Sequence, residues 1–289
     1  MSGAVEKQGI SIIIPVLNAQ KSIRTCVGSV LASEYSNENM EIICVDNGST
    51  DATPSILRAF QPAVRVIDEP RRGPSAARNA GIRAATYKFA AFTDADCFVA
   101  PTWLPNIVKP LQGGAGAAGG RILARPGAGP VETFGELVHD HASAIERDRP
   151  PYLIGMNMAS SLATLKRIGL FDERLLRGED CDIAYRLIQA GERIVYQHDA
   201  VVYHHNRDTL AKLAREAWLH GYYGTLLRNV HRPFIGEYRA SLASDSAGPS
   251  DRPANSVLSP WRIAAYWRLF RTCSAAGKLF GAYFPPDFA

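Results

Sequence analysis

The sequence is poor in several features that mark particular classes of protein. Its five cysteines are scattered over 289 residues and form no CxxC pair, which argues against a disulfide framework and against a cysteine zinc site. No stretch approaches the roughly 18 consecutive apolar residues of a membrane-spanning helix, and residues 1–8 contain no apolar signal-peptide core. These absences predict a cytoplasmic protein, either free there or peripheral on the inner face of the membrane.

Basic blocks are absent as well. The formal net charge is +4 and the pI is near 8.8, with no lysine- or arginine-rich run of the kind that binds nucleic acid. We therefore expect no nucleic-acid partner. Hydrophobic residues make up 46% of the chain, which is enough to bury the core of one large domain, or of one domain with an appendage.

The first half of the chain alternates between strand and helix patterns. Residues 10–17 form a nearly continuous apolar run, as expected for a strand that is buried on both faces of a parallel sheet. The elements that follow are predicted as a helix at 22–31, a strand at 41–45, a helix at 53–60, a strand at 64–67, a helix at 76–85 and a strand at 89–93. This alternation predicts a parallel, doubly wound α/β unit.

The second half has a less regular pattern. Residues 113–120 form either a flexible loop or the start of a strand at 117–123. Further elements are predicted as a helix at 134–147, a turn at 155–157, a helix at 179–190, a strand at 193–203 and a helix at 209–230. The composition of residues 241–256 suits a flexible linker, which gives a main domain at 1–240 and a carboxy-terminal segment at 257–289.

Acidic residues stand at the ends of three of these elements. Residues 45–51 follow one strand, Asp94 and Asp96 follow another, and Glu179 and Asp180 open a helix. Ligands of open α/β sheets bind outside the carboxyl ends of the strands. The acids at two such ends suggest a cation, a phosphate-bearing ligand or both, and those at the helix start supply a candidate base.

Asp94 and Asp96 are spaced to share a cation. Two residues apart in an extended backbone, they leave the same face with Cα atoms about 6.6 Å apart, at a rise of ~3.3 Å per residue. Magnesium and manganese prefer oxygen ligands, and a sparse acidic pair implies that a substrate diphosphate completes the shell. The alternative is structural, with Asp94 capping a turn and Asp96 solvated.

Five segments, taken together, resemble family 2 glycosyltransferases with the GT-A fold, of the non-processive bacterial type. The similarity extends over residues 11–228 and rests on the order and spacing of segments 14–18, 45–51, 77–81, 94–96 and 178–182. It implies a mixed, doubly wound sheet with flanking helices and a helical carboxy-terminal appendage. It also implies a hexosyltransferase-like enzyme that transfers a sugar from a nucleotide diphosphate sugar to a saccharide or lipid-linked saccharide. The transfer would invert the configuration at the anomeric carbon and would be assisted by Mn²⁺ or Mg²⁺.

The resemblance also implies roles for residues on the donor side. Pro15 is expected in the loop after the first strand, and Asn18 belongs to the same nucleotide-facing motif. Asp46 is expected to hydrogen-bond the base or ribose, and Arg78 to reach the nucleotide. Asp94 is expected to approach both the ribose and the metal.

Further implied roles concern the metal and the acceptor. Asp96 is expected to bind the metal directly, with His204 completing the shell in preference to His205, because successive strand residues point to opposite faces. Gly155 and Asn157 match a turn beneath the sugar, although an ordinary turn is the alternative. Asp180 is the expected general base, and its neighbour Glu179 is the alternative for that role.

Some features depart from the family pattern. Asn47 stands where many members have aspartate, and Arg71 where asparagine is frequent, which leaves nucleotide preference open. No Gln-x-x-Arg-Trp motif follows the base, so we expect a single sugar addition. The alternatives are a nucleotidyltransferase, which needs a glycine-rich basic loop that residues 15–18 do not provide, and a non-catalytic nucleotide-sugar-binding protein.

The carboxy-terminal segment is rich in aromatic and basic residues between 261 and 284. Such a segment suits peripheral contact with a membrane interface. It equally suits a helix packed on the core or on a second subunit, which would make a homodimer. The sequence leaves these possibilities open.

Overall fold

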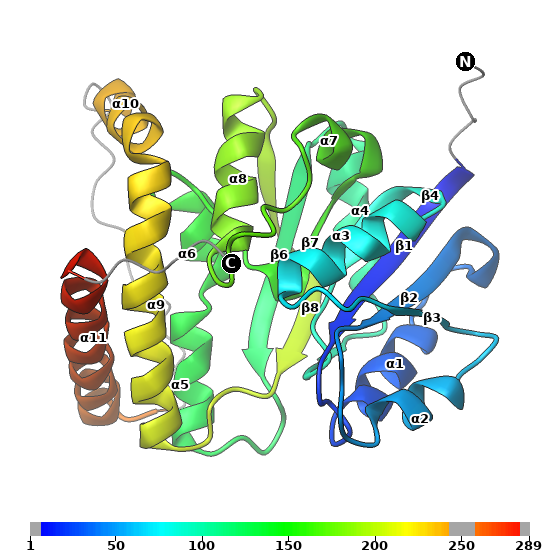
Figure 1. The fold of residues 1–289 in the computed structure, drawn as a ribbon, viewed down its shortest axis with the longest axis horizontal. Coiled ribbons are helices and arrows are strands. Elements are labelled where there is room, and N and C mark those ends of the chain that lie inside the picture. Colours follow the sequence, from blue (N-terminus) through cyan, green and yellow to red (C-terminus); the bar gives the residue numbers. More distant parts are fainter. Residues whose placement is uncertain (1–6, 243–257, 284–289) are drawn as a thin grey trace.

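A mixed sheet of eight strands forms the centre of the molecule (Figure 1). The computed structural model describes residues 7–242 and 258–283. The strands are β1 (Lys7–Val16), β2 (Met40–Asp46), β3 (Arg65–Asp68), β4 (Tyr87–Phe92), β5 (Cys97–Val99), β6 (Ala117–Ala124), β7 (Met158–Ser161) and β8 (Ile194–His204), and they lie in the order β3-β2-β1-β4-β7-β6-β8-β5.

The predicted doubly wound unit is present in the first half of this sheet. Strands β3, β2, β1 and β4 are parallel, whereas β7 runs antiparallel to both β4 and β6. β8 is parallel to β6, and β5 pairs antiparallel with β8. Ile12, Ile13 and Ile14 have no exposed surface, as expected for a central strand covered on both faces.

Helices cover both faces of the sheet. They are α1 (Ile23–Leu31), α2 (Thr53–Arg58), α3 (Pro74–Ala84), α4 (Trp103–Gln112), α5 (Pro130–Val138), α6 (His141–Glu146), α7 (Leu162–Arg167), α8 (Glu179–Gln189), α9 (Leu210–Val230), α10 (Arg232–Leu242) and α11 (Pro260–Tyr283). Side chains of α1, α2 and α4 pack with Ile12 and Ile14, whereas those of α3, α7 and α8 pack with Ile13. Gly81 of α3 is required by this packing, because a Cβ there would lie 2.4 Å from Ile13.

Two expectations about local structure are wrong. Residues 134–147 do not form one helix, because the chain breaks after α5 and Asp140 caps α6 by accepting a hydrogen bond from the Ser143 N–H at 3.0 Å. Pro15 lies within β1, not in the loop after it. The Val16 carbonyl accepts a hydrogen bond from the Asn47 N–H at the end of β2, so the backbone of the preceding residue, Pro15, faces β4. Pairing with β4 has already ended at Ile13. The proline is tolerated there because no partner needs the N–H group that it lacks.

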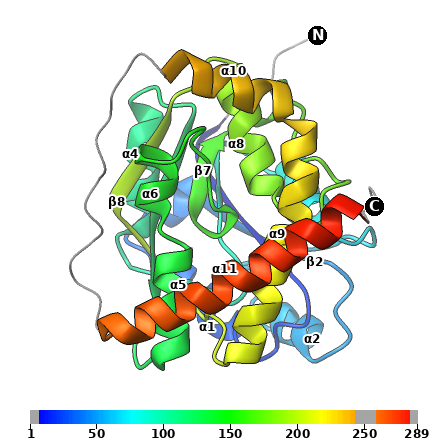
Figure 2. The same ribbon diagram turned by 90° about the vertical axis from the view of Figure 1, so that its left-hand side faces the viewer.

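The last helix, α11, packs along α9 and crosses α5 (Figure 2). Glycines allow the two long helices to approach closely: a Cβ on Gly277 would lie 2.1 Å from the Trp218 carbonyl oxygen, and one on Gly221 would lie 2.0 Å from that of Ser274. Near the start of α11, Trp267 contacts Phe134 of α5, with ring centroids 5.0 Å apart. Most of the proposed linker lies outside the described residues; its first two residues, 241 and 242, end α10.

No helix within the described ranges, 7–242 and 258–283, is long and apolar enough to cross a membrane.

Candidate active site

The turn between β4 and β5 carries two of the predicted metal-binding acids. An extended backbone was expected here and is not found, because the Cys97 N–H donates to the Asp94 carbonyl at 3.0 Å and closes a turn. The two carboxylates therefore meet different partners, Asp94 with Arg78 and Asp96 with His204. Their side chains are 30% and 41% exposed, so each can offer an oxygen to a bound ion.

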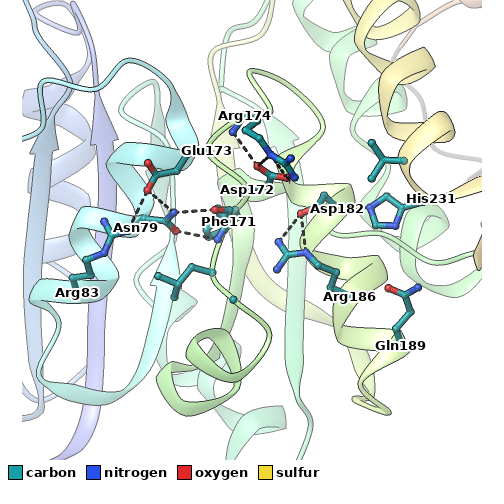
Figure 3. A pocket seen from close by; sticks show the side chains of 13 residues that line it. Asn79, Arg83, Phe171, Asp172, Glu173, Arg174, Asp182, Arg186, Gln189 and His231 are labelled. Atoms are coloured by element: carbon teal, nitrogen blue, oxygen red, sulfur yellow. Dashed lines mark hydrogen bonds and ion pairs between the residues drawn. The ribbon is translucent and has the colours of Figure 1, made fainter. Parts of the chain in front are cut away.

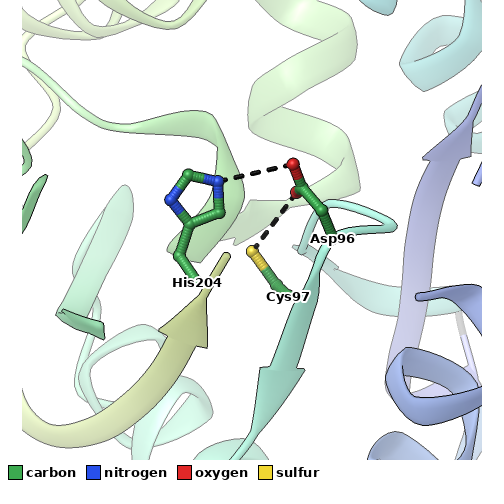
Figure 4. Close-up of side chains that lie close together, drawn as sticks. All are labelled: Asp96, Cys97 and His204. Carbon is green, nitrogen blue, oxygen red and sulfur yellow. Dashed lines mark hydrogen bonds and ion pairs between the residues drawn. The ribbon is translucent and has the colours of Figure 1, made fainter. Parts of the chain in front are cut away.

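Strand β5, which the sequence analysis did not predict, explains why His204 reaches Asp96. Cys97 pairs with His204 at the end of β8, and the His205 N–H donates to the Asp96 carbonyl at 3.1 Å. The Nε2 atom of His204 then lies 3.5 Å from Oδ2 of Asp96 (Figure 4). His205 is exposed, so only His204 lies at this site, in agreement with the expected alternation along the strand.

A second pair of buried residues orients the His204 ring. Its Nδ1 lies 2.7 Å from Oδ1 of Asn206, and the same oxygen lies 3.2 Å from Nδ1 of His139. When this oxygen accepts from both rings, His204 carries a proton on Nδ1, and its Nε2 is the ring atom that faces Asp96. The sequence analysis missed Asn206 and His139. The break between α5 and α6 brings His139 to this position, and the sequence analysis did not predict that break.

Mutual attraction sets the charge of the Asp96 and His204 pair. Burial is the largest influence on the pKa of His204 and acts to lower it, but Asp96 raises that pKa above its usual value. Burial likewise acts against ionisation of Asp96, yet His204 and Arg207 hold the pKa of this carboxyl below its usual value. Asp96 is therefore kept in the charged form that binds cations.

Cys97 lies beside this pair. Its Sγ, a carboxylate oxygen of Asp96 and a ring nitrogen of His204 all lie within 4.8 Å of one another (Figure 4). Burial raises the pKa of the Cys97 thiol well above its usual value, so the sulfur stays protonated. Because magnesium and manganese prefer oxygen ligands, and metals bind the thiolate form of cysteine, Cys97 is poorly suited to ligate these ions.

Arg78 of α3 joins two of the three acidic segments. Its Nη2 lies 3.0 Å from Oδ1 of Asp94, and its Nη1 lies 2.7 Å from Oε1 of Glu179. The guanidinium is buried and lies over the ring of Phe171, with Cζ 5.6 Å from the centroid. Gly155 leaves room for it, since a Cβ at that residue would lie 2.9 Å from Nη2.

The two acids that open α8 have different environments. Glu179 is buried, and burial together with the charge of Asp180 raises its pKa to about 7, although Arg78 acts in the opposite direction. Asp180 is partly exposed. Its Oδ2 accepts from the Gly155 N–H at 2.9 Å, and its Oδ1 from the Cys181 N–H at 2.8 Å. Asp180 is thus the more accessible acid, held in place by backbone donors.

The loops after β1 and β2 are tied to each other. Oδ1 of Asn18 accepts from the Thr50 N–H at 2.8 Å, and the Asn18 N–H donates to Oγ of Ser49 at 2.9 Å. Buried Asp46 accepts from the Ser49 N–H at 3.0 Å. Asn18 and Asp46 therefore shape the loops at the carboxyl ends of these strands, where the nucleotide was expected.

Asn47, one of the departures from the family pattern, has a structural explanation. Its Nδ2 donates to the carbonyls of Glu69 at 2.8 Å and Arg71 at 2.7 Å, and its Oδ1 accepts from the Gly73 N–H at 2.9 Å. Aspartate could not donate to those two carbonyls. Asn47 thus fixes the loop that leads from β3 into α3.

The expected position of Asn157 beneath the sugar needs correction. Its side chain has no exposed surface. Its Oδ1 accepts from Nε1 of Trp103 at 2.9 Å, and its Nδ2 donates to the carbonyls of Arg121 and Ala200, each at 2.9 Å. Because all its donors and a lone pair are used inside the core, Asn157 positions strands β6 and β8 and does not line the cleft.

A polar hollow of about 630 Å³ lies on another side of α3 and α8 (Figure 3). Its arginines are ion-paired within it, Arg83 with Glu173, Arg174 with Asp172 and Arg186 with Asp182, and Nε2 of His231 lies 2.8 Å from Oδ1 of Asp182. The Asn79 side chain also holds the backbone of Phe171: its Nδ2 donates to the Phe171 carbonyl at 2.9 Å, and its Oδ1 accepts from the Phe171 N–H at 3.0 Å. This network anchors the 169–174 loop and contains none of the predicted site residues.

The sequence of this chain is similar to those of known glycosyltransferases. The model of the family "Glycosyl transferase family 2" matches residues 11–166, more than half of the chain. Glycosyltransferase AglE of Haloferax volcanii is 28% identical over 201 residues, which are 68% of this chain and 66% of that protein. A pre-mycofactocin glycosyltransferase of Mycobacterium tuberculosis is 30% identical over 226 residues, 73% of this chain but only 46% of that protein.

A solved structure with a similar fold is the mannosyltransferase PcManGT from Pyrobaculum calidifontis in complex with GDP-Man and Mn²⁺. The TM-score is 0.66 at 22% identity, over 97% of this chain and 88% of that one. The shared architecture is the mixed sheet with flanking helices expected of the GT-A fold. The matched family model shows that this chain belongs to glycosyl transferase family 2.

Proposed function

We propose that this protein transfers a sugar, with inversion, from a nucleotide diphosphate sugar to a saccharide or lipid-linked saccharide acceptor, one sugar at a time. The observation that carries the proposal is the convergence of the acidic segments: Arg78 contacts both Asp94 and Glu179. These contacts bring the proposed donor-side acid Asp94 together with the start of α8, where the proposed base lies. The mannosyltransferase of similar fold was solved with GDP-Man, which supports a nucleotide-sugar donor here.

The residues present fit a divalent cation. Asp94 and Asp96 offer carboxylate oxygens that are partly exposed, and His204 offers a nitrogen on the Asp96 side. This hard donor set suits Mn²⁺ or Mg²⁺, with substrate phosphates completing the shell. When bound, such an ion stabilises the negative charge that develops on the leaving diphosphate.

Asp180 is the proposed general base. The acceptor hydroxyl gives its proton to the Asp180 carboxylate while its oxygen bonds to the anomeric carbon. The bond from that carbon to the phosphate oxygen breaks on the opposite face, and the nucleoside diphosphate leaves with the electron pair. The Gly155 and Cys181 N–H groups hold the two carboxylate oxygens. Glu179 is less suited, because it is buried against Arg78.

The alternatives have less support. A nucleotidyltransferase would need a basic glycine-rich loop after β1, where the chain has Leu17 and Asn18, which is tied to Thr50. An assay of nucleoside diphosphate release distinguishes a glycosyltransferase from a non-catalytic binding protein. The release should be measured with Mn²⁺, GDP- and UDP-sugars, and saccharide or isoprenoid-linked saccharide acceptors. Binding of the donor without acceptor-dependent release, across these acceptors, would favour a binding protein.

We also propose peripheral membrane contact through the outer face of α11. Trp261, Leu279 and Tyr283 are 68%, 62% and 74% exposed on this helix, and Arg262 and Lys278 lie among them. Aromatic rings and cations in this arrangement suit an anionic interface. The alternative is that the same face contacts a second copy in a homodimer.

A further inference from the structure

A groove of about 980 Å³ lies between the first half of α11 and the corner where α5 meets α6. Its floor is apolar and comes from two helices, with Leu137 and Val138 of α5 facing Ile263 and Trp267 of α11. The edge-to-face contact of Trp267 with Phe134 holds the indole in place. The groove is therefore a feature of the α5–α11 contact.

Two arginines line the groove without an acidic partner among the described residues. Arg268 and Arg271 line it and are exposed, and neither makes an ion pair within residues 7–242 and 258–283. Arg271 lies over the Trp267 ring, with Cζ 5.6 Å from the centroid. The groove also contains two acids. Asp140 pairs with Arg147, which lines the groove as well, and Asp148 hydrogen-bonds Tyr152.

One segment of the chain links the groove to the proposed base. Asp148 and Tyr152 line the groove, and three residues beyond Tyr152 the Gly155 N–H donates to Asp180. Burial is the main cause of the raised pKa of Tyr152, and the neighbouring groups Cys181, Asp148 and Asp180 raise it further. A ligand in the groove can thus extend towards Asp180 along this segment.

We propose that this groove binds the acceptor, and that the acceptor carries a phosphate or diphosphate group joined to a hydrocarbon chain. The hydrocarbon lies on the apolar floor and Arg268 and Arg271 contact the phosphate, which guanidinium groups bind well. A purely saccharide acceptor would use neither feature. The inference rests on the proposed function and names the acceptor class for it.

Binding of farnesyl diphosphate tests the groove. Titrations are followed by tryptophan fluorescence and calorimetry, below the concentration at which the probe forms micelles and in EDTA, so that metal-bound diphosphate does not contribute. We expect saturable binding that the double variant Arg268→Gln, Arg271→Gln weakens roughly tenfold or more, the scale of a lost charged hydrogen bond. Arg215→Gln is the matched control, because Arg215 is an exposed arginine of α9 that lies outside the groove lining.

Two further probes separate the parts of the ligand. Farnesol lacks the charge and inorganic pyrophosphate lacks the chain, and each should bind at least roughly tenfold more weakly than farnesyl diphosphate. Val138→Glu, which places a negative charge on the floor, should also abolish binding. Equal binding to the double variant, or equal binding of pyrophosphate alone, would overturn the proposal.

Nucleotide binding keeps this inference distinct from the proposed function. GDP and UDP are titrated with Mn²⁺ on the same protein samples. Loss of nucleotide binding in the wild type would count against the glycosyltransferase site itself. Intact nucleotide binding without farnesyl diphosphate binding would overturn only the groove. Binding to vesicles but not to monomeric farnesyl diphosphate would likewise reject the groove and leave membrane contact through the outer face of α11.

Discussion

Asp96 is the residue on which we expect cation binding to depend most, because its carboxylate is partly exposed and held charged by His204. Asp96→Ala and Asp94→Ala should each abolish the Mn²⁺-dependent part of GDP or UDP binding, measured by calorimetry with and without the metal. Asp199→Ala serves as the control, because Asp199 is 73% exposed and outside the cluster. Unchanged Mn²⁺-dependent affinity in both site variants would refute the metal assignment.

In the proposed mechanism Asp180 acts only on the proton of the attacking hydroxyl, so its loss should leave donor binding intact. General bases typically contribute ~10²–10⁴-fold in rate, and Asp180→Asn should lower kcat by about that much with the donor Kd within a few fold. Asparagine keeps an oxygen to accept from the Gly155 N–H. Glu179→Gln should be milder. If Glu179→Gln removed activity and Asp180→Asn kept most of it, the two roles would be exchanged.

Glu179 should make the protein less stable as the pH rises. Its pKa is about 7 in the folded protein and 4.5 as an ordinary glutamate. Between these values the folded state holds more protons than the unfolded state, so the free energy of unfolding falls as pH rises through this window. Glu179→Gln should remove this part of the slope. Metal-free melting curves from pH 4.5 to 8 check it, and an unchanged slope would contradict the burial argument.

The individual site residues were only partly predictable. Asp94, Asp96 and Glu179 stand at element ends in the sequence, and the backbone geometry of a strand separates His204 from His205. In contrast, the Asn206 and His139 contacts depend on a helix break between α5 and α6, and Asn157 is satisfied by partners from three other segments. Such long-range pairings are not encoded in local spacing.

At the scale of elements, periodicity located the buried strands well. β1 and β2 are covered on both faces and therefore have continuous apolar runs. The short strand β5 has only three residues, too few to show alternation, and its place is set by pairing with β8. α4 contains Pro110, a residue that weakens any helical pattern. α10 was missed as well, although it continues close to the predicted end of the main domain.

The contact between α9 and α11 should reverse the usual effect of replacing glycine in a helix. Gly277→Ala should destabilise the protein by about 1–3 kcal/mol, because its Cβ would lie 2.1 Å from the Trp218 carbonyl oxygen. Gly224→Ala in α9 is the control: nothing lies within 4 Å of its Cβ position, so helix propensity should stabilise by roughly 0.5–1 kcal/mol. Denaturant unfolding measures both, and shifts of the same sign would contradict the packing argument.

At the scale of the whole molecule, the outer face of α11 should carry the membrane contact. The triple variant Trp261→Ser, Leu279→Ser, Tyr283→Ser should lose flotation with anionic liposomes. These three side chains are exposed, and the variant removes the two aromatic rings and the leucine side chain that are proposed to enter the lipid interface. Neutral liposomes are the control for charge. If wild type and variant float equally little, while the wild type alone sediments as a dimer, the face is a subunit contact.

The position of α11 also affects the protein while it is being made. Phe134 has no exposed surface, and part of its cover is Trp267, which leaves the ribosome 133 residues later. At a synthesis rate of about 5–20 residues per second, this interval is roughly 7–27 s. Throughout that time the part of α5 that Trp267 covers in the folded protein lacks this cover on the nascent chain, and a chaperone or the membrane surface can occupy it before α11 arrives.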